Sequence, residues 1–128
     1  MGKNKNMPVE NISAENLRKI LRNKKAAVEL IDVREPDEYQ FMRIKGSKLI
    51  PMGELVSRLD EINWDKEVVF ICRSGSRSAL MADLAASLAK KNIKNLQYGI
   101  YECFKDGRGE FLEGEFLAGD KESAANYF

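Results

Sequence analysis

The sequence contains no histidine in 128 residues, and its only cysteines are Cys72 and Cys103. The lack of histidine excludes catalysis by a serine–histidine or cysteine–histidine pair and removes the commonest metal ligand. Two cysteines cannot build a zinc site alone and form at most one disulfide, which excludes a disulfide-stapled scaffold. We therefore expect no metal and no cofactor. Any chemistry must use a thiol, carboxylates, hydroxyls, arginine or lysine.

Long apolar runs and an excess of one charge are also lacking. No run approaches the roughly 18 apolar residues of a membrane-spanning helix, and the first ten residues have no apolar stretch typical of a signal peptide. The 21 lysines and arginines nearly balance the 20 aspartates and glutamates, which argues against a general nucleic-acid or membrane binder. We expect a cytoplasmic protein that binds neither nucleic acid nor membranes, although an exported chain whose signal was removed would look the same.

The length and composition indicate one domain with short additions at both ends. An apolar fraction of 44% and a charged fraction of 32% are typical of a globular domain. We expect a polar leader at residues 1–8, a folded domain at residues 9–105 and a C-terminal extension at residues 106–128. Apolar side chains in the extension predict partial packing on the domain or on a partner chain, namely Phe111, Leu112, Phe116 and Leu117.

Apolar patterns along the chain alternate between strand-like and helix-like segments. Strand-like segments are expected at residues 9–12, 27–33, 48–50, 67–72 and 95–98. Helix-like segments are expected after the cap Ser13, from Pro36, and at residues 53–62, 78–91 and 99–104. Strands separated by helices predict an α/β fold, with a central parallel sheet of about five strands and helices on both faces. Ligands of such sheets bind at the carboxyl ends of the strands, where Cys72 stands.

The segment CRSGSRS follows the most apolar strand-like segment and leads into a helix. Cys72 opens this turn, and Gly75 permits a backbone conformation that other residues resist. Such a turn points several N–H groups into one concavity, and the helix N-terminus adds a partial positive charge. Arginines add full charges and serines add hydrogen-bond donors. The residues expected to bind a sulfur or an oxyanion are Arg73, Ser74, Gly75, Ser76 and Arg77.

The loop also suggests how its cysteine is activated. A thiol with the ordinary cysteine pKa of about 8.5 is mostly protonated at pH 7, and helix N-termini and nearby cations commonly stabilise the nucleophilic thiolate. Because the chain has no histidine, this electrostatic route is the only visible way to activate Cys72. The alternative is that Cys72 ends a core strand as a small apolar residue. The charged, polar and glycine residues after it do not build a core, so a reactive thiol is favoured.

Three segments together resemble the single-domain rhodaneses, or thiosulfate sulfurtransferases. They are LIDVREPDEY at residues 30–39, a G-x-x-x-I-P pattern within residues 44–52, and CRSGSRSA at residues 72–79. They occur in the family's order at similar separations, and the resemblance spans about residues 9–105. It implies a rhodanese-like fold, a central parallel sheet with helices on both faces.

The resemblance also implies that Cys72 is the catalytic residue of a rhodanese-type sulfurtransferase. In that family the cysteine takes the outer sulfur of a small anionic donor, such as thiosulfate or polysulfide, and becomes a persulfide. The persulfide passes this sulfur to a thiol, to cyanide or to an acceptor protein. By the same resemblance residues 73–77 hold the persulfide, while Asp32 and Arg34 support the site. The alternative for these two residues is a salt bridge at the end of a strand.

Loop length and two departures from the family pattern refine this expectation. The spacing here is Cys-x4-Arg with Ile71 before the cysteine, whereas phosphatases of the same fold have Cys-x5-Arg preceded by histidine, so sulfur transfer is favoured over phosphate hydrolysis. Residues 42–47 depart from the family pattern, and Cys103 stands where the family commonly has tryptophan. We interpret Cys103 as a packing residue, the alternative being a thiol that attacks a Cys72 persulfide. A sulfur carrier or sensor domain acting through a protein partner is the alternative function.

Overall fold

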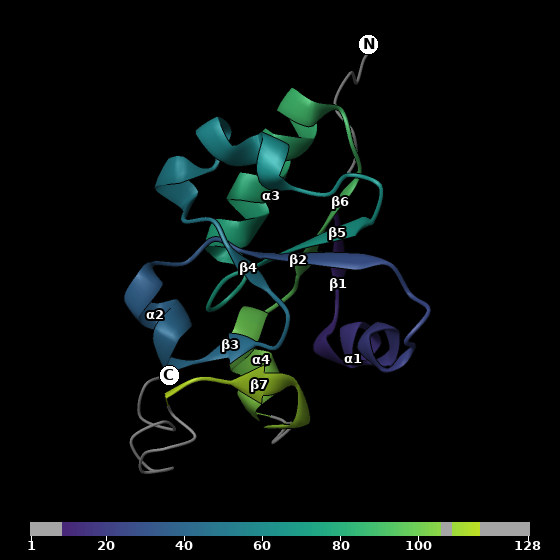
Figure 1. The fold of residues 1–128 in the computed structure, drawn as a ribbon, viewed down its shortest axis with the longest axis vertical. Coiled ribbons are helices and arrows are strands. Elements are labelled where there is room, and N and C mark those ends of the chain that lie inside the picture. The colour runs from purple at the N-terminus through teal and green to yellow at the C-terminus, as the bar shows by residue number, and fades with distance from the viewer. Residues whose placement is uncertain (1–8, 106–108, 116–128) are drawn as a thin grey trace.

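Five parallel strands form the central sheet of the computed structural model, which describes residues 9–105 and 109–115. Their order is β1–β6–β5–β2–β4, and every neighbouring pair is parallel (Figure 1). The strands are β1 (Val9–Ile12), β2 (Val28–Asp32), β4 (Lys48–Leu49), β5 (Glu67–Ile71) and β6 (Ile93–Leu96). The expected parallel sheet is confirmed, and β5, the strand that precedes Cys72, lies at its centre.

Helices follow most strands and return the chain to the start of the sheet. The α-helices are α1 (Ala14–Arg22), α2 (Pro36–Phe41), α3 (Ser76–Ala89) and α4 (Gly99–Lys105), and the 3-10 helices are η1 (Met52–Glu54), η2 (Val56–Glu61) and η3 (Gly109–Phe111). Ser13 caps α1 as predicted, because its hydroxyl accepts a hydrogen bond from the Asn16 N–H at 3.0 Å. Within residues 9–105 and 109–115, no helix is long and apolar enough to cross a membrane.

Two apolar cores lie on opposite faces of the sheet. Because side chains alternate along a strand, Val69 and Ile71 of β5 belong to the core that α1 and α4 cover, whereas Phe70 and Cys72 belong to the core that α3 covers. Helices therefore cover both faces, as expected. The two cysteines are separated by this arrangement, since Cys103 of α4 belongs to the first core.

Helix α3 buries its small residues and exposes its large ones. Met81 and the fully buried alanines Ala82, Ala85 and Ala86 face the sheet, which lets the helix pack closely on it. The leucines spaced four apart face solvent instead, since Leu80, Leu84 and Leu88 are 61%, 38% and 52% exposed. Their four-residue spacing predicts a helix here but does not indicate which face of it is buried.

A small antiparallel sheet is present that the sequence pattern does not predict. Strand β3 (Arg43–Ile44) pairs with β7 (Leu112–Glu113), and Leu112 is buried in the same core as Ile44. The Arg43 Nε atom donates a hydrogen bond to Glu113 at 2.9 Å. This part of the C-terminal extension therefore packs on the domain as expected. Phe116, Leu117 and the leader at residues 1–8 lie outside the described residues.

Several element boundaries, and the type of one helix, differ from the expectation. The predicted helix at residues 53–62 is wrong in type, because η1 and η2 are 3-10 helices and the backbone of Arg58 (φ −122°, ψ 18°) is not helical. The Arg58 guanidinium bonds both Glu54 and Glu61, which holds this irregular segment together. Strand β6 and helix α3 each begin two residues earlier than predicted.

Candidate active site

Cys72 follows the end of β5 and is fully buried beneath the loop that joins this strand to α3. The backbone N–H groups of Gly75 and Ser78 donate hydrogen bonds to its Sγ atom at 3.1 and 3.3 Å. Ser78 lies in the first turn of α3, so the sulfur is also at the positive end of a 14-residue helix. Of residues 73–77, Gly75 supplies one of these N–H groups, whereas the other comes from Ser78, outside the predicted set. Backbone N–H groups at a helix N-terminus stabilise an anionic sulfur.

Gly75 makes this loop geometry possible. Its φ of 98° lies in the left-handed region, which glycine enters without steric cost. A Cβ atom here would lie 2.9 Å from the Tyr98 nitrogen and 3.2 Å from the Leu96 oxygen, both of them backbone atoms. The loop therefore packs directly against the turn that follows β6, and this position admits no side chain.

A buried polar network fixes the Ser78 hydroxyl beside the sulfur. The Ser78 Oγ atom lies 3.4 Å from Cys72 Sγ and also donates a short hydrogen bond to the Asn95 carbonyl oxygen. The Asn95 amide in turn donates to the Gly75 carbonyl at 3.3 Å and to the Asn11 side chain at 3.1 Å. Because Ser78 has one hydroxyl proton, it can donate to the Cys72 sulfur or to Asn95 but not to both at once. Asn95 is a site residue that the sequence reasoning missed.

Arg77 forms an ion pair with a carboxylate that the sequence analysis did not identify. Its guanidinium donates to both oxygens of Glu38 on α2, at 2.9 and 2.8 Å. These hydrogen bonds lower the pKa of Glu38 to about 2, and Glu38 raises the pKa of Arg77. The expected positive charge at the end of the loop is therefore largely compensated, and the pair fastens the first turn of α3 to α2.

Asp32 and Arg34 form a second, fully buried ion pair. Asp32 accepts hydrogen bonds from the Arg34 backbone N–H at 3.0 Å and from its Nε and Nη2 atoms at 2.9 and 2.8 Å. Arg34 also donates to the Met42 carbonyl, while its buried Nη1 atom has no hydrogen-bond partner within the described part of the chain. This is the salt bridge weighed as the alternative for these residues. Their charges still act on the loop, because Asp32 helps to raise the pKa of Arg77 and Arg34 helps to lower that of Glu38.

The start of α4 braces the other side of the loop. The N–H groups of Ile100 and Tyr101 donate to the carbonyls of Cys72 and Arg73, both at 3.0 Å. Gly99 is packed so tightly that a Cβ atom would lie 2.3 Å from the Cys72 carbonyl oxygen. The carbonyls of Cys72 and Arg73 are thus turned toward α4, away from the concavity that holds the sulfur.

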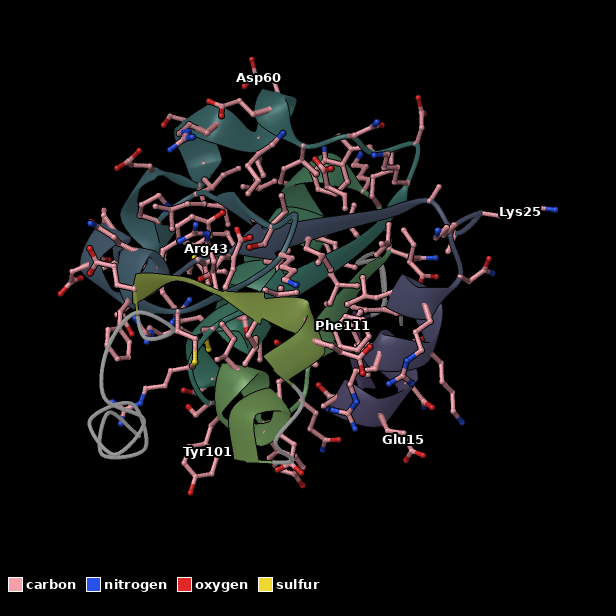
Figure 2. All side chains as sticks on the ribbon, turned by 60° about the horizontal axis from the view of Figure 1, so that its bottom comes forward. Glu15, Lys25, Arg43, Asp60, Tyr101 and Phe111 are labelled. Carbon is pink, nitrogen blue, oxygen red and sulfur yellow. The ribbon has the colours of Figure 1, made fainter. Side chains whose placement is uncertain are left out.

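An open pocket of about 460 Å³ lies beside the exposed part of the loop, at Ser74. Arg73, Ser74 and Ser76 are exposed, and Ser74 lines this pocket together with Tyr98, Tyr101 and Glu102. Figure 2 shows the Tyr101 side chain projecting outward from α4.

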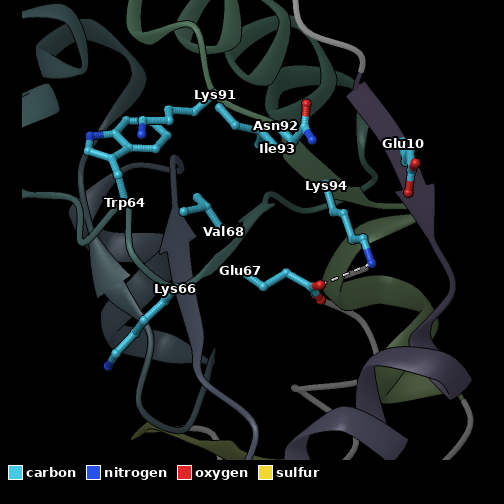
Figure 3. Close-up of a pocket in the computed structure, with 9 residues that line it drawn as sticks. All are labelled: Glu10, Trp64, Lys66, Glu67, Val68, Lys91, Asn92, Ile93 and Lys94. Carbon is cyan, nitrogen blue, oxygen red and sulfur yellow. Dashed lines mark ion pairs between the residues drawn. The ribbon is translucent and has the colours of Figure 1, made fainter.

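A second hollow, of about 300 Å³, lies at the opposite edge of the sheet (Figure 3). It is lined by the first residues of β5 and β6 and by Trp64, and Lys94 and Glu67 form an ion pair within it at 3.3 Å. It contains no thiol, so the candidate nucleophile and this hollow lie at opposite ends of the strands.

Cys103 is buried away from this chemistry. It is 4% exposed and packs with Ile100 and Leu112 in the core on the other face of the sheet from Cys72. The two cysteines are not joined by a disulfide. A thiol on the far side of the sheet is not placed to attack a Cys72 persulfide, so the structure supports the packing interpretation of Cys103.

Comparisons with known proteins agree with this fold. A family model described as a Rhodanese-like domain matches residues 13–106. A sulfurtransferase of Allochromatium vinosum is 30% identical over 99 residues, which cover 77% of this chain and 92% of that protein. The crystal structure of a rhodanese-related protein from Thermoplasma volcanium superposes with a TM-score of 0.67 at 30% identity, covering 77% of this chain and 93% of that one.

Other relatives extend beyond the matched region. The uncharacterized protein YqhL of Bacillus subtilis is 38% identical over 71 residues, which are 56% of each chain. The chain spans between 38% and 56% of the length of three curated relatives, YqhL among them.

The fold and the site together define an α/β domain that presents a cysteine in an N–H-lined loop at the carboxyl edge of a parallel sheet. The chain belongs to the rhodanese-like domain family, since the family model covers most of its length.

Proposed function

We propose that this protein moves a sulfane sulfur from a small anionic donor to a thiophilic acceptor through a persulfide on Cys72. The observation that supports this most is the pair of backbone N–H groups, from Gly75 and Ser78, directed at a thiol beside the N-terminus of α3. Donors of this chemistry include thiosulfate and polysulfide. Acceptors include thiols, cyanide and the cysteine of an acceptor protein.

The proposed reaction has two displacement steps on sulfur. The Cys72 thiolate attacks the outer sulfur of thiosulfate, a new S–S bond forms, and sulfite leaves with the electron pair of the broken bond. The acceptor thiolate or cyanide then attacks the outer persulfide sulfur, and Cys72 leaves as a thiolate. Both steps need a stabilised anionic sulfur in the loop, which the N–H groups of Gly75 and Ser78 would provide.

Burial of the cysteine gives the persulfide a further use. Cys72 is fully buried, so a large acceptor meets the thiol itself poorly. The added sulfur extends the reactive atom by one S–S bond, about 2 Å, toward the exposed rim formed by Ser74 and Ser76. Sulfur transfer to a bulky acceptor is therefore easier from the persulfide than direct reaction of the thiol would be.

Intact-protein mass spectrometry after incubation with thiosulfate or polysulfide tests this proposal. We expect a gain of one sulfur, about 32 Da, in the wild type and in Cys103→Ser, and no gain in Cys72→Ser. The absence of a gain with every sulfane donor would contradict the proposal.

The burial of Cys72 also favours a second candidate, a sulfur carrier or sensor that acts through a protein partner. Such a protein forms the same persulfide but releases it slowly to small acceptors. Persulfide loading without rapid multiple turnover with cyanide would support the carrier, whereas fast turnover with thiosulfate and cyanide alone would support the enzyme.

A further inference from the structure

Tyr98 holds a backbone conformation that bulky residues rarely adopt. Its φ is 64°, in the left-handed region. Among the described residues, Lys90 is the other non-glycine residue with positive φ, and it ends α3, where this conformation is common. Tyr98 instead stands in the turn between β6 and α4, which contacts the Cys72 loop.

Burial of the Tyr98 side chain does not offset this strain. The residue is 59% exposed, and a glycine would take the same backbone conformation without steric cost. The turn itself is fixed by the contact with Gly75 and by the packing of Gly99 on the Cys72 carbonyl. Backbone strain that is not offset by packing is characteristic of functional sites. Packing therefore does not explain why a tyrosine stands at this position.

The ring lines the pocket beside the loop. Tyr98, Tyr101 and Glu102 surround this pocket together with Ser74, two residues after the reactive cysteine. The pocket is open to solvent, and its volume of about 460 Å³ gives room for an organic group. Thiosulfate is a small inorganic dianion that would leave most of this space empty.

We propose that Tyr98 and Tyr101 form a subsite for the organic group of a monoanionic sulfane compound, such as an organic thiosulfonate, and so determine the donor specificity of Cys72. This inference rests on the proposed sulfur transfer. The Cys72 thiolate attacks the outer sulfur of R–SO2–S⁻, the S–S bond to cysteine forms, and the sulfinate R–SO2⁻ leaves with the electron pair. The group R lies against the two phenol rings during this step, where aromatic contact favours an arene over a methyl group.

The test compares benzenethiosulfonate with methanethiosulfonate as donors. For each protein, kcat/KM is measured with both, and the ratio of the two values is the readout. We expect the wild type to prefer the benzene compound, and we expect Tyr98→Gly and Tyr101→Ala each to lower the ratio by about five- to tenfold. Tyr98→Phe keeps the ring and should keep the ratio. Leu80→Ala, an exposed apolar change on α3 outside the pocket, is the matched control.

The outcomes separate this inference from the function on which it rests. An unchanged ratio in Tyr98→Gly and Tyr101→Ala, with Cys72 persulfide still formed, overturns the subsite and leaves the sulfur transfer intact. No Cys72 persulfide with any donor in the wild type overturns both. A melting temperature of Tyr98→Gly equal to or above that of the wild type, together with the lowered ratio, supports strain that serves binding.

Discussion

The two cysteines of this protein are equally hidden but differ in what surrounds them. Cys72 is fully buried and receives hydrogen bonds from two backbone N–H groups at the start of α3. Cys103 is 4% exposed and packs among apolar side chains on the other face of the sheet. Burial alone therefore does not distinguish a reactive thiol from a packing one. What sets Cys72 apart is its place at the start of α3, where two backbone N–H groups are directed at its sulfur, a setting that stabilises an anion.

The sharpest way to break this difference is to distort the donors around Cys72. Gly75→Ala places a Cβ atom 2.9 Å from the Tyr98 nitrogen and 3.2 Å from the Leu96 oxygen, at a left-handed φ. We expect the free energy of unfolding to fall by about 3 kcal/mol. We also expect most of the persulfide loading to be lost. Urea denaturation and intact mass measure the two effects.

Gly46→Ala is the matched control for this change. Gly46 also has positive φ (81°), but a Cβ atom there would meet nothing within 4 Å. Gly46→Ala should lower the free energy of unfolding by about 1 kcal/mol, through the backbone conformation alone. It should leave persulfide loading intact. Equal losses of loading in both variants would show that the geometry around Gly75 is not what activates Cys72.

Removing the Ser78 hydroxyl tests the network beside the sulfur. Ser78→Ala leaves the buried Asn95 carbonyl oxygen without its donor, which should cost about 2 kcal/mol of stability. The Ser78 N–H remains on the sulfur, so loading should slow but persist. Thermal unfolding and the rate of mass gain check this, and complete loss of loading would mean that the hydroxyl, not the N–H groups, is essential.

The Glu38–Arg77 pair should contribute a pH-dependent part of the stability. The hydrogen bonds from Arg77 lower the pKa of Glu38 from its ordinary value of 4.5 to about 2. A carboxyl whose folded-state pKa is depressed stabilises the fold above its unfolded pKa and loses that contribution as the pH falls through the folded pKa. At pH 7 the free energy of unfolding of the wild type should therefore be higher than that of Glu38→Gln by on the order of 1 kcal/mol. The difference is this small because the pair is partly exposed.

This difference should disappear between about pH 4.5 and pH 2. Urea denaturation of both proteins across that range measures it. A stability difference that stays constant down to pH 2 would contradict the ion-pair explanation.

The smallest effect is expected at the other cysteine. Cys103→Ala removes one buried sulfur from the core that α1 and α4 cover, which should cost about 1 kcal/mol through lost packing. Persulfide loading should equal that of the wild type. A marked loss of loading in this variant would show that Cys103 takes part in the chemistry.

The Cys72 loop was predictable because its geometry is local. The N–H groups that reach the sulfur come from Gly75 and Ser78, within six positions of it, and the glycine required by the backbone is visible in the sequence. The parallel sheet was predictable for a related reason, since a strand such as β5 carries the continuous apolar run VVFI.

The partners of the loop were not predictable because they come from distant segments. Glu38 is 39 positions from Arg77 and Asn95 is 17 positions from Ser78, and neither forms part of a pattern in its own segment that points to the loop. The β3–β7 pair was missed because two-residue strands are too short to show alternation. The strain at Tyr98 depends on a dihedral angle that the residue type gives no reason to expect.

Mapping the transferred sulfur between the two cysteines tests the central claim most directly. The wild-type protein is incubated with a sulfane donor, alkylated and digested, and the sulfur content of the peptides carrying Cys72 and Cys103 is measured by mass spectrometry. The structure predicts that the added sulfur is on Cys72, the thiol held by N–H donors, and that Cys103 carries none. Sulfur on Cys103, or shared equally by both cysteines, would contradict the claim that these donors select the reactive thiol.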